Sequence, residues 1–403
     1  MISRKTAFFW VITLSLITGI VTFSMTNIIS FSIGEKVVIS KQKYEHFQYL
    51  NNNFDKMLGL KAFIEENYYQ PVDDVNFEDG IIKGLFKALD DPYSVYMSKD
   101  EFDSFMTHTK GTYGGIGVIM TPGEDGFITV VSPIEDTPGE RAGIQPEDKI
   151  IKVNDEEVIA EKLDEAVAMI KGEPGTKVTL TIIRPGKADP FSVEITREEI
   201  RLNTVKSRVL KDKIGYIRIT MFDEQTSQDF KEHLTKLKKE GIEGLVIDLR
   251  DNPGGLLSEC VKIADEILGK QIIVYTEDRS GKREYENSDS GKINMPMAIL
   301  INKGSASASE ILAGAVKDSK SGTLIGTTTF GKGLVQRVKP LDDGTGIKLT
   351  TSQYFTPNGT NIHGKGIEPN YVVEMPEELK EKLEITDEED VQLQKAIQVL
   401  ISK

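Results

Sequence analysis

The spacing of apolar residues changes twice along this chain. Residues 43–69 and 77–91 carry apolar side chains at helical spacing, and Pro71 and the Asp91-Pro92 pair end these two runs. A Ser-x-x-Glu pattern at Ser98 and Glu101 predicts the start of a further helix. From about Gly111, short β-rich runs alternate with Gly, Pro and Asp turns around one helix over 161–171. This part is typical of a small separate module.

From Lys213 onward, apolar strands alternate with amphipathic helices. This order predicts α/β layers around a mainly parallel sheet. In such sheets the functional residues gather where strands end. Two glycine turns, one after Leu249 and one after Ile301, leave the ends of apolar strands. The last residues read as an acidic loop followed by a helix.

The N-terminal stretch from Thr6 to Gly34 has no charged residue. About 20 apolar residues span a bilayer, so this stretch is long enough to cross one. A cleaved signal peptide is the alternative. Because the run is long and no A-x-A-like site follows it, we interpret it as an uncleaved signal anchor. Arg4 and Lys5 favour a cytoplasmic N-terminus, although three lysines beyond the run weaken this bias.

Composition narrows the function classes. The chain has 403 residues, 28% charged and 39% hydrophobic, which is typical of globular domains. A net charge of −14 argues against a nucleic-acid partner. Cys260 is the single cysteine, so neither an intramolecular disulfide nor a cysteine-based zinc site is expected. We expect no metal and no cofactor.

The turn after Ile301 contains three serines in the segment Asn302–Asp318. Ser307 and Glu310 match a capping box, so Ser307 is explained either as a helix cap or as a nucleophile at a helix start. None of the four histidines is near in sequence. Lys332 follows between two glycines and can act as a base if burial lowers its pKa. The alternative is an exposed lysine in a turn. If a strand begins at Lys332, Gln336 points the same way and can hold the amine.

A competing motif overlaps this lysine. Residues Gly326 to Gly333 nearly match the phosphate-binding P-loop, but Gly333 replaces the required Ser or Thr. The following residues are typical of a strand, whereas a P-loop opens a helix. Nucleotide binding is therefore disfavoured.

Several ordered motifs together resemble the C-terminal processing peptidases, which are PDZ-containing serine proteases with a Ser-Lys mechanism. They are the serine segment Asn302–Asp318, "FGKGLVQ" at Phe330–Gln336, "DLRDNPGG" at Asp248–Gly255, "KALDDPYSVYMS" at Lys87–Ser98 and "HGKGIEPN" at His363–Asn370. The resemblance covers nearly the whole chain. It implies a serine endopeptidase that recognises apolar protein C-termini.

The resemblance also assigns the catalytic roles. Ser307, the middle serine, is the implied nucleophile, Lys332 the general base and Gln336 its support. The backbone N–H groups of Gly255 and Ala308 are the implied oxyanion hole, with Gly254 as an alternative to Gly255. Ser305 and Ser309 are expected to pack or cap.

The segment Tyr113–Val118 resembles the carboxylate-binding loop of PDZ domains. Backbone N–H groups of a glycine-rich turn form a nest for a terminal carboxylate, and the peptide adds as a strand beside it. The expected loop residues are Gly114, Gly115, Ile116, Gly117 and Val118. An ordinary β-turn is the alternative for this segment taken alone.

The expected fold class is thus a multidomain α+β chain. Its expected parts are a cytoplasmic N-terminus and transmembrane anchor (1–35), a helical region (36–110), a PDZ domain (111–195), a Ser-Lys protease core with a mainly parallel sheet (196–375) and a helical tail (376–403). The protein is expected in the cell membrane as a single-pass protein with its catalytic part on the extracytoplasmic side. The resemblance implies a homodimer through the helical region and the tail. A catalytically silent PDZ scaffold at the membrane is the alternative function.

Overall fold

The computed structural model describes residues 3–28, 31–33, 36–73, 75–289, 291–380, 382 and 385–402. The chain forms two compact units, Met1–Ile82 and Lys83–Lys403. The predicted domain boundary after residue 35 lies outside the described residues.

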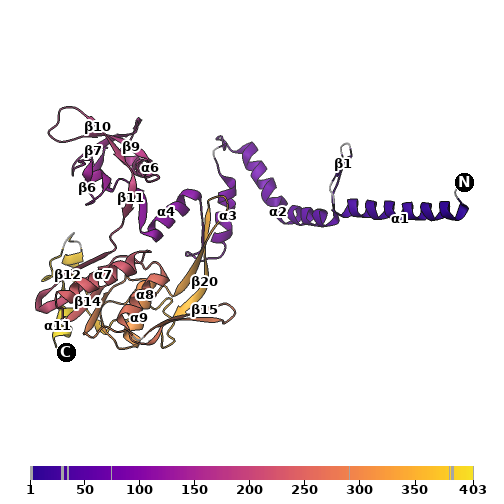
Figure 1. Ribbon diagram of the computed structural model, residues 1–403. Coiled ribbons are helices and arrows are strands. Elements are labelled where there is room, and N and C mark those ends of the chain that lie inside the picture. The colour runs from indigo at the N-terminus through magenta and orange to yellow at the C-terminus, as the bar shows by residue number, and fades with distance from the viewer. Residues whose placement is uncertain are drawn as a thin grey trace. The chain divides into compact units, whose positions relative to one another are not determined.

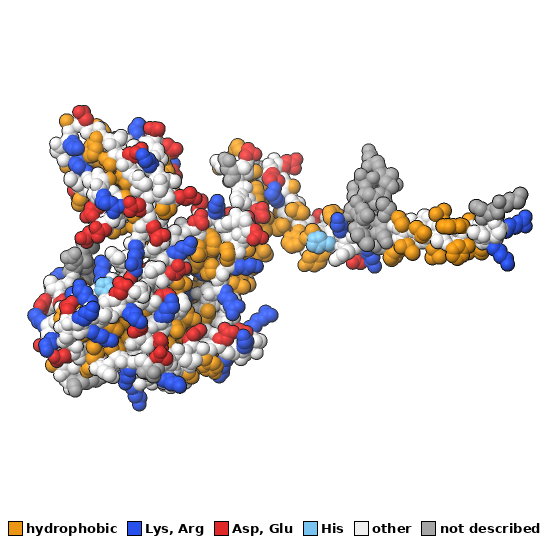
Figure 2. Space-filling view, viewed as in Figure 1, with side chains coloured by type: hydrophobic (Ala, Val, Ile, Leu, Met, Phe, Trp, Pro, Cys, Tyr) orange, Lys and Arg blue, Asp and Glu red, His pale blue; other side chains and the backbone are white. Residues whose placement is uncertain are grey.

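The N-terminal unit is mainly helical. Its long helices are α1 (Arg4–Ile28) and α2 (Lys41–Asn67), with a short hairpin of β1 (Phe31–Ile33) and β2 (Lys36–Val38) between them. Large apolar side chains are exposed along α1 (Figure 2); Phe8 and Trp10, for example, are 69% and 64% exposed. Within the described residues, the stretch Arg4–Phe23 is long and apolar enough to cross a membrane. A membrane anchor and a signal sequence both fit this helix.

The chain enters its second unit through α3 (Phe77–Lys87). A short strand β3 (Val95–Met97) and helix α4 (Lys99–Lys110) follow. The predicted capping box is confirmed, because Glu101 N–H donates to the Ser98 hydroxyl and Ser98 N–H donates to the Glu101 carboxylate at 2.8 Å. Gly111 ends the helix in a left-handed conformation.

The β-rich module has its own antiparallel sheet and its own apolar core. The strands run in the order β10-β9-β7-β6-β5, so β5 is an edge strand. Helix α6 falls inside the predicted helix range 161–171. The elements are β4 (Thr112–Gly115), β5 (Val118–Pro122), β6 (Ile128–Pro133), α5 (Pro138–Arg141), β7 (Lys149–Val153), β8 (Glu156–Glu157), a 3-10 turn (Ala160–Lys162), α6 (Leu163–Ile170), β9 (Lys177–Ile183), β10 (Phe191–Thr196) and β11 (Glu198–Arg201), which pairs with β4.

The C-terminal core contains a six-stranded sheet in the order β12-β13-β14-β17-β18-β21. Figure 1 labels β12 and β14 of this sheet. Every pairing in it is parallel except that of β12 with β13. Leu245 and Ile247 of β14 pack in the cluster with α7, α8 and α9, whereas Val246 packs in the cluster with α11. Burial on both faces explains the continuous apolar strands. The elements are β12 (Val205–Val209), a 3-10 turn (Lys211–Lys213), β13 (Ile214–Ile219), α7 (Thr226–Lys239), β14 (Gly244–Asp248), α8 (Leu257–Ile267), β17 (Met297–Ile301), α9 (Ala308–Asp318), β18 (Thr323–Gly326), β21 (Tyr371–Val372), α10 (Glu377–Lys380) and α11 (Val391–Ile401).

A second core sheet is antiparallel. It has the order β16-β15-β20-β19, and β3 pairs with β20. Its strands are β15 (Gln271–Asp278), β16 (Arg283–Ser288), β19 (Leu334–Pro340) and β20 (Gly346–Phe355). The predicted mainly parallel sheet thus describes only one of two sheets. The other escaped prediction because strands such as β16 are polar and mostly exposed, and because β15 and β20 pair across a long stretch of chain.

The parallel sheet also brings the two glycine turns together. Strands β14 and β17 are neighbours, and Asp248 at the end of one pairs with Leu300 near the end of the other. The turns after Leu249 and Ile301 therefore leave the same edge of the sheet side by side.

Candidate active site

The two turns are in direct contact where β14 and β17 end. A Cβ on Gly254 would lie 2.8 Å from Ser307 Cβ and 3.0 Å from Ala308 N. A Cβ on Gly304 would lie 2.7 Å from the Cα of Asp251. Only glycine permits this approach at both positions. The side chain of Asn302 strengthens the contact by accepting the Asp251 N–H at 2.9 Å.

The three serines differ in what they contact. Ser305 and Ser309 are fully buried and donate to main-chain carbonyls of the neighbouring turn, at Leu249 (2.7 Å) and Asn252 (3.0 Å). Ser307 is half-buried and has φ 55° and ψ −113°, a region that non-glycine residues rarely adopt. Such main-chain strain is typical of functional sites. Ser307 is the N-cap of α9 and forms a capping box with Glu310, as the cap interpretation expects, but its hydroxyl, unlike those of Ser305 and Ser309, donates to no carbonyl of the neighbouring turn.

Glu310 connects the turn after Ile301, which carries Ser307 and is called the serine turn below, to the segment that carries Lys332, called the lysine segment. Its carboxylate is fully buried and accepts four hydrogen bonds. One oxygen accepts the N–H groups of Ser307 and Lys332, each at 2.8 Å. The other accepts the Gly331 N–H at 2.7 Å and the Thr329 hydroxyl at 2.6 Å. One side chain therefore fixes the main chains of both predicted catalytic residues.

Lys332 is half-buried next to this carboxylate. Burial lowers the pKa of its amine, and the positive charge of Lys348 lowers it further, whereas Asp91 and Glu310 oppose the shift. The amine lies over the ring of Tyr93, 4.7 Å from the centroid. In the described part of the chain, no hydrogen bond joins the side chains of Lys332 and Ser307. A lowered pKa is what a lysine needs to serve as a base.

Tyr354 contacts both halves of this arrangement. Its buried hydroxyl donates to the carbonyl oxygen of Lys332. Burial raises the pKa of Tyr354 well above its usual value, Glu310 adds to the rise, and a side-chain hydrogen bond from Ser307 opposes it. Sequence reasoning missed Tyr354, since no local pattern marks it, and saw Glu310 only as a capping residue.

Among the described residues, no hydrogen bond joins the side chains of Gln336 and Lys332. Strand β19 begins at Leu334, not at Lys332, and a register shift between Val335 and Gln336 breaks the simple alternation. Strand geometry therefore gives no reason for the side chains of Lys332 and Gln336 to point the same way, as expected from the sequence. The Gln336 amide donates to Thr350 at 3.3 Å. Because a strand follows Gly333, the segment also lacks the helix that a P-loop requires.

The predicted oxyanion residues lie at the junction of the turns. Ala308 is the first residue of α9, where helix N–H groups point outward. Gly254 N–H donates to the Asn252 side chain at 2.8 Å, which removes it as a free donor. Gly255 has φ 136°, and a Cβ there would lie 2.2 Å from the carbonyl oxygen of Phe222.

A buried cluster of charged side chains holds the turn after Leu249 in place. Burial opposes ionisation of Asp248, but Arg250 and Tyr216 hold its pKa below the usual value. Arg250 also donates to Asp390, the N-cap of α11, at 2.7 Å, and to Gln392 at 3.0 Å. This cluster ties the turn to the C-terminal helix.

The predicted peptide-binding loop lies in the β-rich module. Gly117 has φ 70°, and its carbonyl accepts the Ile134 N–H at 2.8 Å. Ile116 is buried in the module's core. Gly114 and Gly115 are paired in β4, and Val118 begins the edge strand β5. The loop therefore ends where an open strand edge begins, as a peptide-accepting site requires.

The residues that the structure describes contain no group of three or more His, Cys, Asp or Glu side chains placed to hold a metal ion.

Comparisons with known proteins place these features in a family context. Family models match over residues 16–101 (activating protease CtpB N-terminal domain), 129–184 (PDZ domain) and 213–373 (peptidase family S41). The third span contains Ser307, Lys332, Gln336, Gly255 and Ala308, whereas the loop 114–118 precedes the matched PDZ span.

Relatives match over most of the chain. The carboxy-terminal processing protease CtpA of Bacillus subtilis is 38% identical over 367 residues, or 91% of this chain and 77% of the relative. CtpB of the same organism is 40% identical over 360 residues, or 86% and 74%. Among solved structures, a photosystem II D1 C-terminal processing protease is 28% identical with a TM-score of 0.47, covering 84% of this chain and 94% of that one.

The Glu310 network leads to a first prediction. Glu310→Gln places an NH₂ group against N–H donors, so we expect the free energy of unfolding to fall by about 2–3 kcal/mol. Peptide cleavage should fall at least about tenfold, because the Ser307 and Lys332 main chains are no longer held together. Chemical denaturation and steady-state kinetics measure both effects. Glu240→Gln, an exposed change at the C-cap of α7, is the control. Equal behaviour of the two variants would contradict the role given to Glu310.

Proposed function

The chain belongs to peptidase family S41 as a PDZ-containing carboxy-terminal processing serine protease, and from this premise we propose that Ser307 is its nucleophile and Lys332 its general base. The observation that carries the assignment is the shared carboxylate of Glu310, which holds the N–H groups of both residues at 2.8 Å. Ser307 is also the serine with a strained main chain and a hydroxyl free of packing contacts to the neighbouring turn.

The proposed reaction is acyl transfer to serine followed by hydrolysis. The neutral amine of Lys332 takes the proton of Ser307 as its Oγ attacks the scissile carbonyl. The N–H groups of Gly255 and Ala308 stabilise the oxyanion. Protonated Lys332 then gives its proton to the leaving amine, and water clears the acyl-enzyme with Lys332 again as base. No metal or cofactor takes part.

Two side chains must move for this reaction. The Lys332 amine has to turn from the ring of Tyr93 toward Ser307, and its burial favours the neutral form that the step needs. Gln336 orients the amine only after its amide leaves Thr350.

Substrate choice is assigned to the β-rich module. We propose that an apolar protein C-terminus adds as a strand to the open edge of β5, with α6 as the opposite wall and the backbone of residues 114–118 around the carboxylate. The edge position of β5 and the partly exposed Ile119 (49%) support this site.

The N-terminal helix is assigned as an uncleaved membrane anchor. Its length, its apolar exposed surface and Arg4 and Lys5 at its start support a single-pass protein with the catalytic part outside the cytoplasm. The proposed homodimer and the five-part domain division remain predictions.

The catalytic assignment predicts the behaviour of three variants. Ser307→Ala and Lys332→Ala should each lose about a thousandfold or more in kcat/KM on an unfolded substrate with an apolar C-terminus, because each removes a covalent or proton-transfer role. Ser305→Ala should retain measurable cleavage. In the parent, kcat/KM should rise with pH through the lowered pKa of Lys332, since only the neutral amine accepts a proton. Cleavage by Ser307→Ala would overturn the nucleophile, and Lys339→Ala serves as an exposed lysine control.

The peptide-binding assignment predicts a glycine effect. Gly117→Ala introduces a Cβ that would lie 2.4 Å from Thr137, so we expect peptide affinity to fall at least about tenfold. Gly126→Ala shares the positive φ but meets no atom within 4 Å, and it should bind normally. Fluorescence anisotropy of a labelled peptide on inactive Ser307→Ala protein measures this. Amidating the peptide's C-terminus should also weaken binding, and indifference to amidation would contradict a carboxylate nest.

The anchor assignment predicts where the intact N-terminus is found. Membrane fractions should contain protein whose N-terminal peptide includes Arg4 and Lys5, as determined by mass spectrometry. Release of a shortened protein into the soluble fraction would instead identify a cleaved signal sequence.

A further inference from the structure

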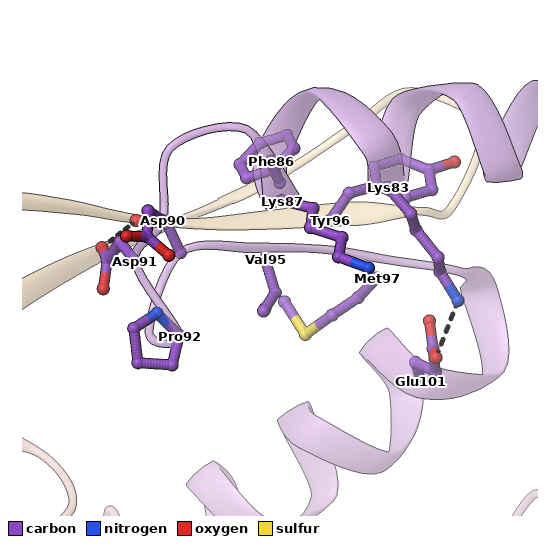
Figure 3. A pocket seen from close by; sticks show the side chains of 11 residues that line it. Lys83, Phe86, Lys87, Asp90, Asp91, Pro92, Val95, Tyr96, Met97 and Glu101 are labelled. Carbon is purple, nitrogen blue, oxygen red and sulfur yellow. Dashed lines mark hydrogen bonds and ion pairs between the residues drawn. The ribbon is translucent and has the colours of Figure 1, made fainter.

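Tyr93 lies where the proposed base is held, although it belongs to a segment far from Lys332 in sequence. Its half-buried ring receives the Lys332 amine at 4.7 Å from the centroid. A pocket of about 780 Å³ adjoins the same segment (Figure 3), with Asp91 and Pro92 at one end and the Lys83–Glu101 ion pair at the other. Asp91, Pro92 and Ser94 line that pocket, but Tyr93 does not. The ring of Tyr93 contacts the amine of Lys332 instead.

The segment that carries Tyr93 is firmly held. The Ser94 hydroxyl donates to the Asp91 carboxylate at 2.6 Å and accepts the Thr350 N–H at 2.9 Å. Immediately afterwards, β3 pairs with β20 in the register Val95 to Lys348. Thr350 also accepts the Gln336 amide. The segment that carries Tyr93 is therefore held against β20, the strand that pairs with Gln336.

Besides Tyr93, three charged side chains act on the Lys332 amine, and two further titratable residues, Tyr354 and His363, lie beside its segment. Lys348 on β20 repels the positive charge of the Lys332 amine. Asp91, in the segment before β3, and Glu310, on α9, attract that charge. The buried hydroxyl of Tyr354 lies at the Lys332 carbonyl. His363 acts on Asp91 and packs its main chain against Gly333. Burial and Lys348 favour the neutral amine of Lys332. The aromatic face of Tyr93 acts in the opposite direction, because it stabilises the protonated amine without adding a charge.

We propose that Tyr93 is a positioning residue of the active site whose ring binds the protonated amine of Lys332 and releases the neutral amine toward Ser307. A cation–π contact exists only for the charged form, so loss of the proton removes the attraction that holds the side chain on the ring. The ring thus couples the protonation of Lys332 to its position. This inference rests on the proposed role of Lys332 as the base.

The test compares pH profiles of kcat/KM for the full chain and three variants, from about pH 6 to about pH 10. Tyr93→Leu keeps an apolar cover but removes the aromatic face, so the acidic limb should move to lower pH by about half to one unit. Tyr93→Phe keeps the ring, and its limb should coincide with that of the parent. Tyr93→Trp offers the stronger aromatic face, so its limb should move to higher pH.

Three outcomes would overturn the proposal. They are an unmoved limb in both Tyr93→Leu and Tyr93→Trp, equal shifts in Tyr93→Leu and Tyr93→Phe, and a loss of rate at every pH without displacement of the limb. Thermal melting confirms that each variant is folded, and if Tyr93→Leu fails to fold, Tyr93→Trp decides. Retained activity in Lys332→Ala would sink the base assignment itself. An inactive Lys332→Ala together with an unmoved limb would sink only the role of Tyr93.

Discussion

The buried carboxylate of Glu310 is the interaction on which the proposed site depends. Burying a carboxylate is costly unless its oxygens are hydrogen-bonded, and here four donors surround it, three of them backbone N–H groups. The donors come from two segments, the turn that carries Ser307 and the segment that carries Lys332. The serine turn supplies one of these donors and the lysine segment supplies the other three, so neither segment alone satisfies the carboxylate. Satisfying it therefore joins two otherwise independent loops into one unit of defined geometry.

The two core sheets divide the work of building this unit. The parallel sheet brings the serine turn next to the turn after Leu249, because β14 and β17 are neighbours that end at the same edge. The antiparallel sheet supplies Tyr354 and, through β3 and β20, fixes the segment that carries Tyr93. Lys332 lies between the sheets, after β18 and before β19. One sheet holds the proposed nucleophile, and the other holds the proposed base. Their relative position is fixed because both sheets pack in one apolar cluster.

The sequence was sufficient for features that are local or that repeat a strong period. The capping box of α4, the β-rich module and the apolar strands of the parallel sheet all have such signals, and the order of motifs indicated the family. The antiparallel sheet was missed because β15 and β20 pair across a long stretch of chain and because strands such as β16 are polar. Tyr354 and Tyr93 were missed for the same reason, since their roles arise only when distant segments pack. The strand argument for Gln336 does not apply, because β19 begins only at Leu334 and a register shift, which alternation cannot reveal, precedes Gln336.

The central claim is that Ser307 forms a covalent acyl intermediate with the help of Lys332. The most direct measurement is intact-protein and peptide mass spectrometry after brief reaction with an activated ester of an apolar peptide, followed by acid quenching. The account predicts one acyl group on the peptide containing Ser307, located on that residue by fragmentation, and no adduct in protein carrying Lys332→Ala. An acyl group on Ser305 or Ser309, or equally rapid acylation without Lys332, would contradict it.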